Sequence, residues 1–344
     1  MLVVLRVKDI PSGSPAGIIF LSYQRPTAIL PAVFQLSSKK SPPTIADLLP
    51  PIHPNGYIHV MKYLFTVMLY LFTVTPGIQA QSSKPLSAKG KLFIIGGGSR
   101  PPDLMQLMIE TAALSKTDYI IVLPMSSAEP DSSFFYLKKD LARTCNNAII
   151  NMNFTSADVN NPLMLDSLKK ARLIFITGGD QNRFMKVVLH TPVHKAIEAA
   201  YKGGSTIAGT SAGAAVMSRQ MITGKEYSGD SLLTGTFKKI ALNYVDLQEG
   251  LGLIDNAIID QHFIARSRYN RLLSVLATHP SLACIGIDEG TAIVVAGKTA
   301  RVAGLSQVIK LSYTGHPPVA AKPIVNMRNI RLDILTRGDH FTLP

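Results

Sequence analysis

From about residue 91 onward, the sequence predicts an α/β domain in which helices cover both faces of a parallel β-sheet, in a three-layer sandwich. Its apolar segments are short and continuous rather than alternating, as in strands buried on both faces of a sheet. Segments with the spacing of amphipathic helices separate them, which is the order of elements that parallel strands require. The expected strands are 92–95, 119–123, 148–152, 172–176 and 206–208. The expected helices include 103–114, 163–170, 182–189 and 193–201.

Glycines follow several of the expected strands, so the chain turns sharply there. The first strand ends at Gly96-Gly97-Gly98 and the fourth runs into Gly178-Gly179. Ligands of open parallel sheets bind at the carboxyl ends of the strands, so these loops are where a site is expected. The first loop does not match a dinucleotide-binding fingerprint, because Pro101 replaces the required glycine, and no phosphate-binding loop is present. We therefore expect no nucleotide cofactor.

The composition excludes several classes of protein. The chain has 344 residues, of which 47% are hydrophobic and 17% charged, so it can bury a substantial core. Its two cysteines, Cys145 and Cys284, cannot form a disulfide framework, and we interpret them as small buried hydrophobes. The net charge is +13, but no block of five Lys or Arg residues occurs and no nucleic-acid-binding motif is present. We therefore expect no nucleic-acid partner.

The first 80 residues differ in composition from the rest. Residues 1–60 contain nine of the 22 prolines and no sustained periodicity, so we interpret them as a disordered extension upstream of a start at Met61. Residues 61–80 combine a lysine, an apolar run, a Pro-Gly break and a final alanine, as a signal peptide does. A buried helix or a membrane anchor is the alternative. The hypothesis leaves 81–344 as a single α/β domain, secreted or periplasmic, without a stable membrane anchor.

The strongest motif is Gly209-Thr210-Ser211-Ala212-Gly213, a G-x-S-x-G sequence between an expected strand and a helix of small residues. In this strand–turn–helix context the serine lies on a strained turn, and its hydroxyl projects above the sheet as a nucleophile. The N–H groups at the start of the helix can stabilise an oxyanion. The alternative is a structural glycine-rich turn. We interpret the motif as catalytic, with Ser211 as the nucleophile.

A serine nucleophile requires a base and a group that orients the base. His262 follows the apolar run 257–259, so it lies at the end of an expected strand, where Ser211 should emerge. A second apolar run, 285–287, leads into Asp288 and Glu289. Geometry, not order along the chain, defines a catalytic triad, so this reasoning leaves the acid open between Asp288 and Glu289.

These segments resemble the cyanophycinase branch of the serine peptidase family that includes dipeptidase E. The resemblance rests on Gly178-Gly179-Asp180-Gln181, Gly209-Thr210-Ser211-Ala212-Gly213-Ala214, Asp260-Gln261-His262-Phe263 with Arg266, Arg268 and Arg271, and Gly286-Ile287-Asp288-Glu289. It implies a class I glutamine amidotransferase-like fold, no metal, and catalysis by Ser211 as nucleophile, His262 as base and Glu289 as orienting acid. It also implies a substrate site lined by Gln181, Asp260, Gln261, Arg266, Arg268 and Arg271. The segment 225–243 looks like an insertion at the rim of the site.

The arginines fit the substrate that the resemblance implies. Cyanophycin is a polyaspartate with an arginine joined to each side-chain carboxyl, so every unit carries a free carboxylate and a guanidinium. Arginine binds carboxylates bidentately, and Asp260 can meet a guanidinium. With a helix beginning near His262, Arg268 and Arg271 lie three apart on one helical face. The alternative is a solvated basic face opposite a buried stripe formed by Tyr269, Leu272 and Leu276.

The resemblance implies a serine exopeptidase that hydrolyses cyanophycin to β-Asp-Arg dipeptides through an acyl-enzyme. Two alternatives stay open. One is an isoaspartyl or Asp-specific dipeptidase of the same family, and the other is a catalytically inactive protein that binds the same ligand. We expect a homodimer and no cofactor.

Overall fold

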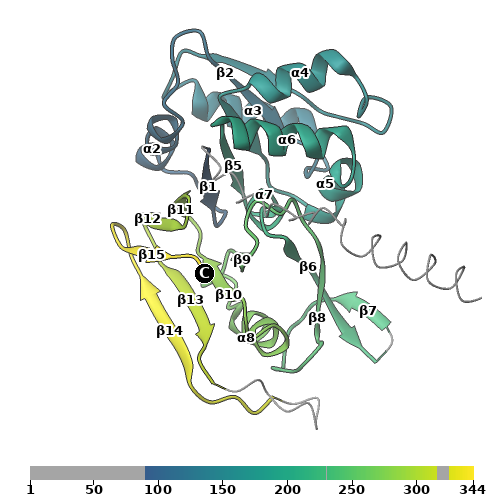
Figure 1. Cartoon of the computed structure of the whole chain (residues 1–344), viewed down its shortest axis with the longest axis vertical. Coiled ribbons are helices and arrows are strands. Elements are labelled where there is room, and N and C mark those ends of the chain that lie inside the picture. The colour runs from purple at the N-terminus through teal and green to yellow at the C-terminus, as the bar shows by residue number, and fades with distance from the viewer. Residues whose placement is uncertain (1–89, 230, 316–324) are drawn as a thin grey trace, which may run out of the picture. The chain divides into compact units, whose positions relative to one another are not determined.

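The computed structural model describes residues 90–229, 231–315 and 325–344 (Figure 1). All of them belong to one unit of the chain, Ser82–Pro344. The predicted extension at 1–60 and the predicted signal peptide at 61–80 lie outside the described residues. No helix in the described part of the chain is long and apolar enough to cross a membrane.

The main sheet confirms the predicted α/β architecture. It has eight strands in the order β15-β12-β11-β1-β5-β4-β2-β3, and neighbours from β1 to β3 pair in parallel. The parallel strands are β1 Lys91–Ile95, β2 Tyr119–Leu123, β3 Ala148–Asn151, β4 Leu173–Ile176 and β5 Thr206–Thr210. The antiparallel strands are β11 Thr291–Ala296, β12 Thr299–Gly304 and β15 His340–Thr342. The parallel strands are the ones that the continuous apolar runs predict.

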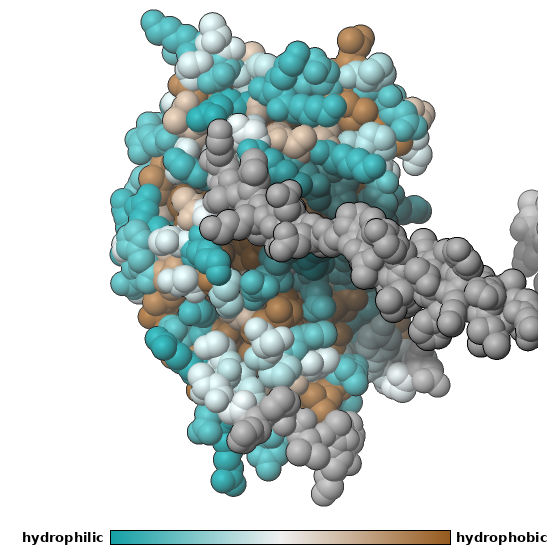
Figure 2. Space-filling view, in the orientation of Figure 1, coloured by the Kyte–Doolittle hydropathy of each residue, from teal (hydrophilic) through white to brown (hydrophobic). Residues whose placement is uncertain are grey.

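Helices cover both faces of this sheet, because successive residues of a buried strand point to opposite sides. In β1, Phe93 and Ile95 belong to the core under two helices, α2 Pro102–Ala112 and α3 Pro130–Leu141. Leu92 and Ile94 belong to the core on the other face. The helices there are α4 Pro162–Lys170, α5 Gln181–Val188, α6 Pro192–Gly203 and α7 Ala212–Ala215. The outer surface of this helical layer is mostly hydrophilic (Figure 2), as a helix with one buried face requires.

A second sheet carries the strands that precede His262 and Glu289. Its order is β14-β13-β10-β9, with β9 Ala257–Gln261 and β10 Ala283–Ile287 parallel to each other. The other strands are β13 Val308–Tyr313 and β14 Ile330–Leu335, and helix α8 covers Tyr269–Thr278. One side of β9 contributes Ile259 to the core of the main sheet, and the other contributes Ile258 to a core with α8. Both sides of β9 are therefore buried, which is why its sequence is continuously apolar.

The predicted insertion belongs to a third, three-stranded sheet in the order β7-β6-β8. Its strands are β6 Gln220–Ser228, β7 Ser231–Thr234 and β8 Val245–Glu249. The start of α5 is bonded to β6, because Gln181 Nε2 donates to the Ile222 carbonyl at 2.8 Å and Asn182 Nδ2 to the Thr223 carbonyl at 3.2 Å. This sheet therefore lies beside the loop that follows β4.

Candidate active site

Ser211 lies on a strained turn between β5 and α7. Its backbone has φ 54° and ψ −113°, a conformation that costs a non-glycine residue about 1–3 kcal/mol. The two flanking glycines make the turn possible. A Cβ on Gly209 would lie 2.3 Å from the Gly213 carbonyl oxygen, and one on Gly213 would lie 2.2 Å from the Ile176 carbonyl oxygen. The G-x-S-x-G spacing therefore reflects a close approach of strand and helix.

Three of the predicted site residues form one chain of hydrogen bonds. His262 Nε2 lies 2.9 Å from Ser211 Oγ, and His262 Nδ1 lies 2.5 Å from Glu289 Oε1. The His262 side chain is 9% exposed and that of Glu289 is 40% exposed. The arrangement has the geometry in which a histidine takes a proton from a serine while a carboxylate orients its ring.

Residue patterns leave open whether Asp288 or Glu289 orients the base. The conformation of the loop after β10 distinguishes the two. Asp288 points away from the His262 ring, and its Oδ1 accepts hydrogen bonds from the N–H groups of Ile264 and Ala265 at 3.0 and 2.9 Å. Ser306 Oγ donates to Oδ2 at 2.6 Å. Burial raises the pKa of Asp288, but the bonds from Ser306 and from the backbone outweigh it, and the net pKa is lowered. Asp288 therefore holds the turn that follows His262, while Glu289 meets the ring.

The surroundings of His262 keep its imidazole neutral. Burial lowers its pKa, the hydrogen bond to Glu289 raises it, and the positive charge of Arg266 lowers it again, so that the net pKa lies below the usual value of 6.5. A neutral imidazole can accept a proton at neutral pH. The base is therefore in its competent form under ordinary conditions.

The structure divides the three arginines of the motif into Arg268 and Arg271, which both reach Asp260, and a separate Arg266. Helix α8 begins at Tyr269, later than expected, so Arg266 and Arg268 precede it and the predicted pair on one helical face does not form. Arg271 donates from Nε to Asp260 Oδ2 at 2.7 Å and from Nη2 to Oδ1. Arg268 Nη1 donates to the Gln261 carbonyl at 2.5 Å. Burial and the neighbouring Arg271 lower the pKa of Arg268 to about 10, so it stays charged at neutral pH.

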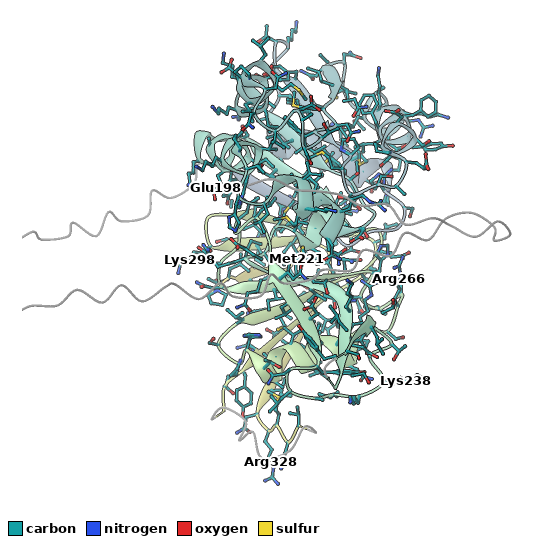
Figure 3. The ribbon with its side chains drawn as sticks, turned by 90° about the vertical axis from the view of Figure 1, so that its right-hand side faces the viewer. Glu198, Met221, Lys238, Arg266, Lys298 and Arg328 are labelled. Atoms are coloured by element: carbon teal, nitrogen blue, oxygen red, sulfur yellow. The ribbon has the colours of Figure 1, made fainter. Side chains whose placement is uncertain are left out.

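Arg266 differs from the other two, because it is exposed and its guanidinium has no hydrogen-bond or ion-pair partner among the residues that the structure describes. Figure 3 shows Arg266 on the same side of the molecule as Lys238, which belongs to the segment 225–243 that the sequence suggests is an insertion. Its charge is close enough to His262 to lower the pKa of that residue. Of the three arginines, Arg266 is therefore the one that is open to a substrate.

Of the two predicted glutamines, Gln261 contacts the nucleophile and Gln181 begins the helix after the Gly178-Gly179 turn. Gln261 Oε1 lies 3.4 Å from Ser211 Oγ, and the Gln261 residue is 6% exposed. Gln181 is 8% exposed and begins α5, directly after the Gly178-Gly179 turn. A Cβ on Gly178 would lie 3.3 Å from the Ser211 Cβ, so this turn borders the hydroxyl. Gln261 therefore contacts Ser211, whereas the Gln181 amide is bonded to the Ile222 carbonyl.

Sequence reasoning missed two features of the site. One is the structural role of Asp288, which is bonded to Ser306. The sequence suggests Asp288 only as an alternative to Glu289 for orienting the histidine. The other is the space beside the His262 ring, where a Cβ on Gly97 would lie 2.4 Å from the ring nitrogen Nε2. The triple glycine after β1 indicates a tight turn, but its closeness to His262 depends on the second sheet. The residues that the structure describes contain no cluster of three or more His, Cys, Asp or Glu side chains that could hold a metal ion.

Comparisons with known proteins agree with this geometry. Residues 92–303 match the family model described as Peptidase family S51. The chain is 33% identical over 284 residues to a protein named Cyanophycinase from Trichormus variabilis, covering 78% of this chain and 91% of that protein. It is 42% identical over 181 residues to another of that name from Geminocystis herdmanii, covering 51% of this chain and 63% of the relative. A solved peptidase from an acI-B1 Actinobacterium shares the fold, with a TM-score of 0.53 and 20% identity over 75% of this chain and 98% of that one. The chain belongs to peptidase family S51.

Proposed function

We propose that this S51 serine peptidase is a cyanophycinase, an exopeptidase that hydrolyses the aspartate backbone of cyanophycin and releases β-Asp-Arg dipeptides. The observation that carries the proposal is the hydrogen-bonded chain Ser211–His262–Glu289. The proteins named Cyanophycinase that match most of this chain support the choice of substrate.

The proposed reaction follows from the positions of these three groups. His262 Nε2 takes the proton of the Ser211 hydroxyl as Oγ attacks the scissile carbonyl carbon. Glu289 keeps the Nδ1 proton in place and stabilises the imidazolium that forms. His262 then gives its proton to the leaving nitrogen, which breaks the C–N bond and leaves an acyl-enzyme on Ser211. Water, deprotonated by the same histidine, hydrolyses the acyl-enzyme.

The negative charge on the attacked oxygen requires hydrogen-bond donors. The N–H groups of Gly178, Gly179 and Ala212 are next to Ser211 and donate no hydrogen bond to another group in the described part of the chain. These groups are the proposed oxyanion site. Removing a single donor of this kind typically costs about 10²–10³ in kcat, so this small region accounts for a large part of the expected rate.

Substrate selection is assigned to the exposed side of the site. Each cyanophycin unit carries a free carboxylate, and Arg266, which has no partner among the described residues, offers a guanidinium fork near His262. Gln261 provides a neutral amide group beside Ser211. Asp260, Arg268 and Arg271 are bonded to one another or to the backbone instead.

Incubation of the purified protein with insoluble cyanophycin tests the proposal. We expect soluble β-Asp-Arg dipeptides, identified by mass spectrometry, and little action on an α-linked Asp-Arg peptide. Equal or faster cleavage of small isoaspartyl peptides, with the polymer left intact, would favour the dipeptidase alternative. Failure to cleave either substrate would favour the inactive binding protein.

We also propose that the protein is exported by a signal peptide at 61–80. The support is the order of lysine, apolar run, Pro-Gly break and alanine in that segment. Amino-terminal sequencing of the exported protein is expected to begin at Gln81. A mature protein that retains residues upstream of Met61 contradicts the proposal.

A homodimer is the proposed assembly. Its support is an exposed aromatic pair on α3, Phe135 at 62% and Tyr136 at 64%, whose rings lie 5.5 Å apart. Aromatic residues exposed side by side are typical of interfaces. Light scattering should give a mass twice that of one chain. The double variant Phe135→Ser with Tyr136→Ser should have the mass of a single chain. A monomeric wild-type protein contradicts this proposal and leaves the enzymatic one untouched.

A further inference from the structure

Asp260 is predicted from sequence to meet a substrate guanidinium, but its surroundings fit another role. Its side chain is 0% exposed, and that of Arg271, which holds it, is 5% exposed. Both carboxylate oxygens of Asp260 accept hydrogen bonds from Arg271. A buried carboxylate that is paired bidentately with an arginine has no open side and no spare charge for a ligand. A substrate guanidinium therefore has no route to Asp260 in this structure.

The same ion pair holds the backbone next to the base. The Gln261 N–H donates to Asp260 Oδ1 at 2.7 Å, and Arg268 Nη1 donates to the Gln261 carbonyl at 2.5 Å. Gln261 precedes His262, whose φ of 49° lies in the left-handed region. A non-glycine residue keeps this conformation only where its surroundings hold it. The turn is thus held before His262 by the Asp260 cluster and after it by Asp288.

We infer that Asp260, with Arg271 and Arg268, forms a positioning group for His262, and that the Asp260 carboxylate takes no part in binding substrate. The group acts through Gln261, whose backbone it fixes on both sides. The inference rests on the proposed catalytic role of His262, and it goes beyond that role by assigning two buried charges, Asp260 and Arg271, and the half-buried Arg268 to the geometry of the base.

Arg271 extends this group to the inserted segment 225–243. Its guanidinium carbon lies 5.4 Å from the centre of the Phe237 ring, a contact typical of a cation and an aromatic face. The Phe237 N–H donates to Glu226 Oε2 at 2.6 Å, and its carbonyl accepts from Asn270 Nδ2 at 3.0 Å. Phe237 is therefore fixed between the insertion and α8, and it covers the outer side of the ion pair.

The test uses a fluorophosphonate probe that labels an activated serine. Ser211 Oγ forms a bond to phosphorus, the P–F bond breaks to release fluoride, and the hydroxyl proton passes to His262. The labelling rate depends on the position of His262 and not on contacts with cyanophycin. We expect Asp260→Asn to lower this rate and kcat together, by about 10- to 100-fold, with KM for cyanophycin unchanged. Arg271→Lys, which keeps the charge but loses the bidentate fork, should fall between wild type and Arg271→Met.

Two comparisons separate positioning from a loss of stability. Leu276→Ala creates a cavity in the same helix, at a fully buried position outside the cluster, and should leave the labelling rate unchanged while lowering Tm. If Asp260→Asn does not fold, the double variant Asp260→Leu with Arg271→Met takes its place, because it leaves no unpaired buried charge. It should show the same loss of labelling.

Labelling of Asp260→Asn at the wild-type rate, with a raised KM for cyanophycin, would overturn the inference and return Asp260 to the binding surface. The same reagent keeps the two proposals apart. If the wild-type protein is labelled but does not cleave cyanophycin, the proposed function fails, while the effect of Asp260 on labelling still decides the inference.

Discussion

The two halves of the catalytic centre are held in place in different ways. Ser211 stands on a turn whose shape depends on its neighbours in sequence, because Gly209 and Gly213 allow strand and helix to approach each other. His262 and Glu289 stand beyond the ends of β9 and β10, where hydrogen bonds between residues far apart in sequence hold them. The nucleophile is therefore positioned by backbone sterics, whereas the base is positioned by buried charges and their partners. Substitutions in the two halves should fail for different physical reasons.

The largest effect should come from breaking the contact between the halves. Ser211→Ala and His262→Ala should each lower kcat by on the order of 10⁶, and the double variant should be little worse, because the two residues act as a unit. Steady-state rates on cyanophycin measure this, with circular dichroism to show that each variant is folded. Losses that add up in the double variant would contradict a shared proton transfer.

The next effect isolates the sterics of the nucleophile turn. Gly213→Ala places a Cβ 2.2 Å from the Ile176 carbonyl oxygen, so we expect the free energy of unfolding to fall by about 1–3 kcal/mol. Thermal or urea unfolding measures the change. Gly203→Ala is the matched control, because a Cβ there meets nothing within 4 Å. Equal stability of the two variants would show that the close approach is not limiting.

A smaller effect tests the hydrogen bonds that hold the base. Asp288→Asn removes the negative charge and puts an amide nitrogen where Oδ2 accepts from Ser306, while its amide oxygen can still accept from Ile264 and Ala265. We expect kcat to fall by up to about tenfold, with stability reduced by about 1 kcal/mol. Glu289→Gln, which acts on the His262 ring directly, should lose more activity and less stability.

The pH dependence of this stability difference has a definite sign. The lowered pKa of Asp288 in the folded state means that its contribution is fully present above its unfolded pKa of about 3.9. It is lost as the pH falls through the folded value. The gap between wild type and Asp288→Asn should therefore be constant near neutral pH and shrink in acid. A gap that widens in acid would contradict this account.

The smallest effect concerns the charge around the base. Arg266 lowers the pKa of His262, so Arg266→Ala should raise this pKa and move the acid limb of kcat/KM to higher pH. The pH profile of kcat/KM on cyanophycin measures the shift. Arg219→Ala is the control, because Arg219 is an exposed arginine paired with Asp255 away from the base. If the acid limb of kcat/KM stays at the same pH in Arg266→Ala, solvent screens the charge of Arg266 fully.

Much of the fold follows from the sequence, because buried parallel strands appear as continuous apolar runs between helices. The five parallel strands of the main sheet were predictable on this basis, and so was the position of Ser211 after β5. The runs before His262 and Glu289 look the same in sequence, yet they belong to a second sheet. Strand pairing depends on partners that are distant along the chain, and the apolar character of a run does not specify them.

The sequence by itself determined the α/β class, the nucleophile turn and the residue types available for catalysis, because each depends on local spacing or on a short motif. The tertiary structure decided which carboxylate meets His262 and which arginines are internal. Asp288 and Glu289 are neighbours in sequence, but Asp288 bonds to the backbone near Ile264 while Glu289 turns to the ring. Arg266 and Arg271 are five residues apart, yet one is exposed and the other is buried against Asp260. Burial and hydrogen-bond partners assign these roles, and both depend on contacts between distant segments that exist only in the folded chain.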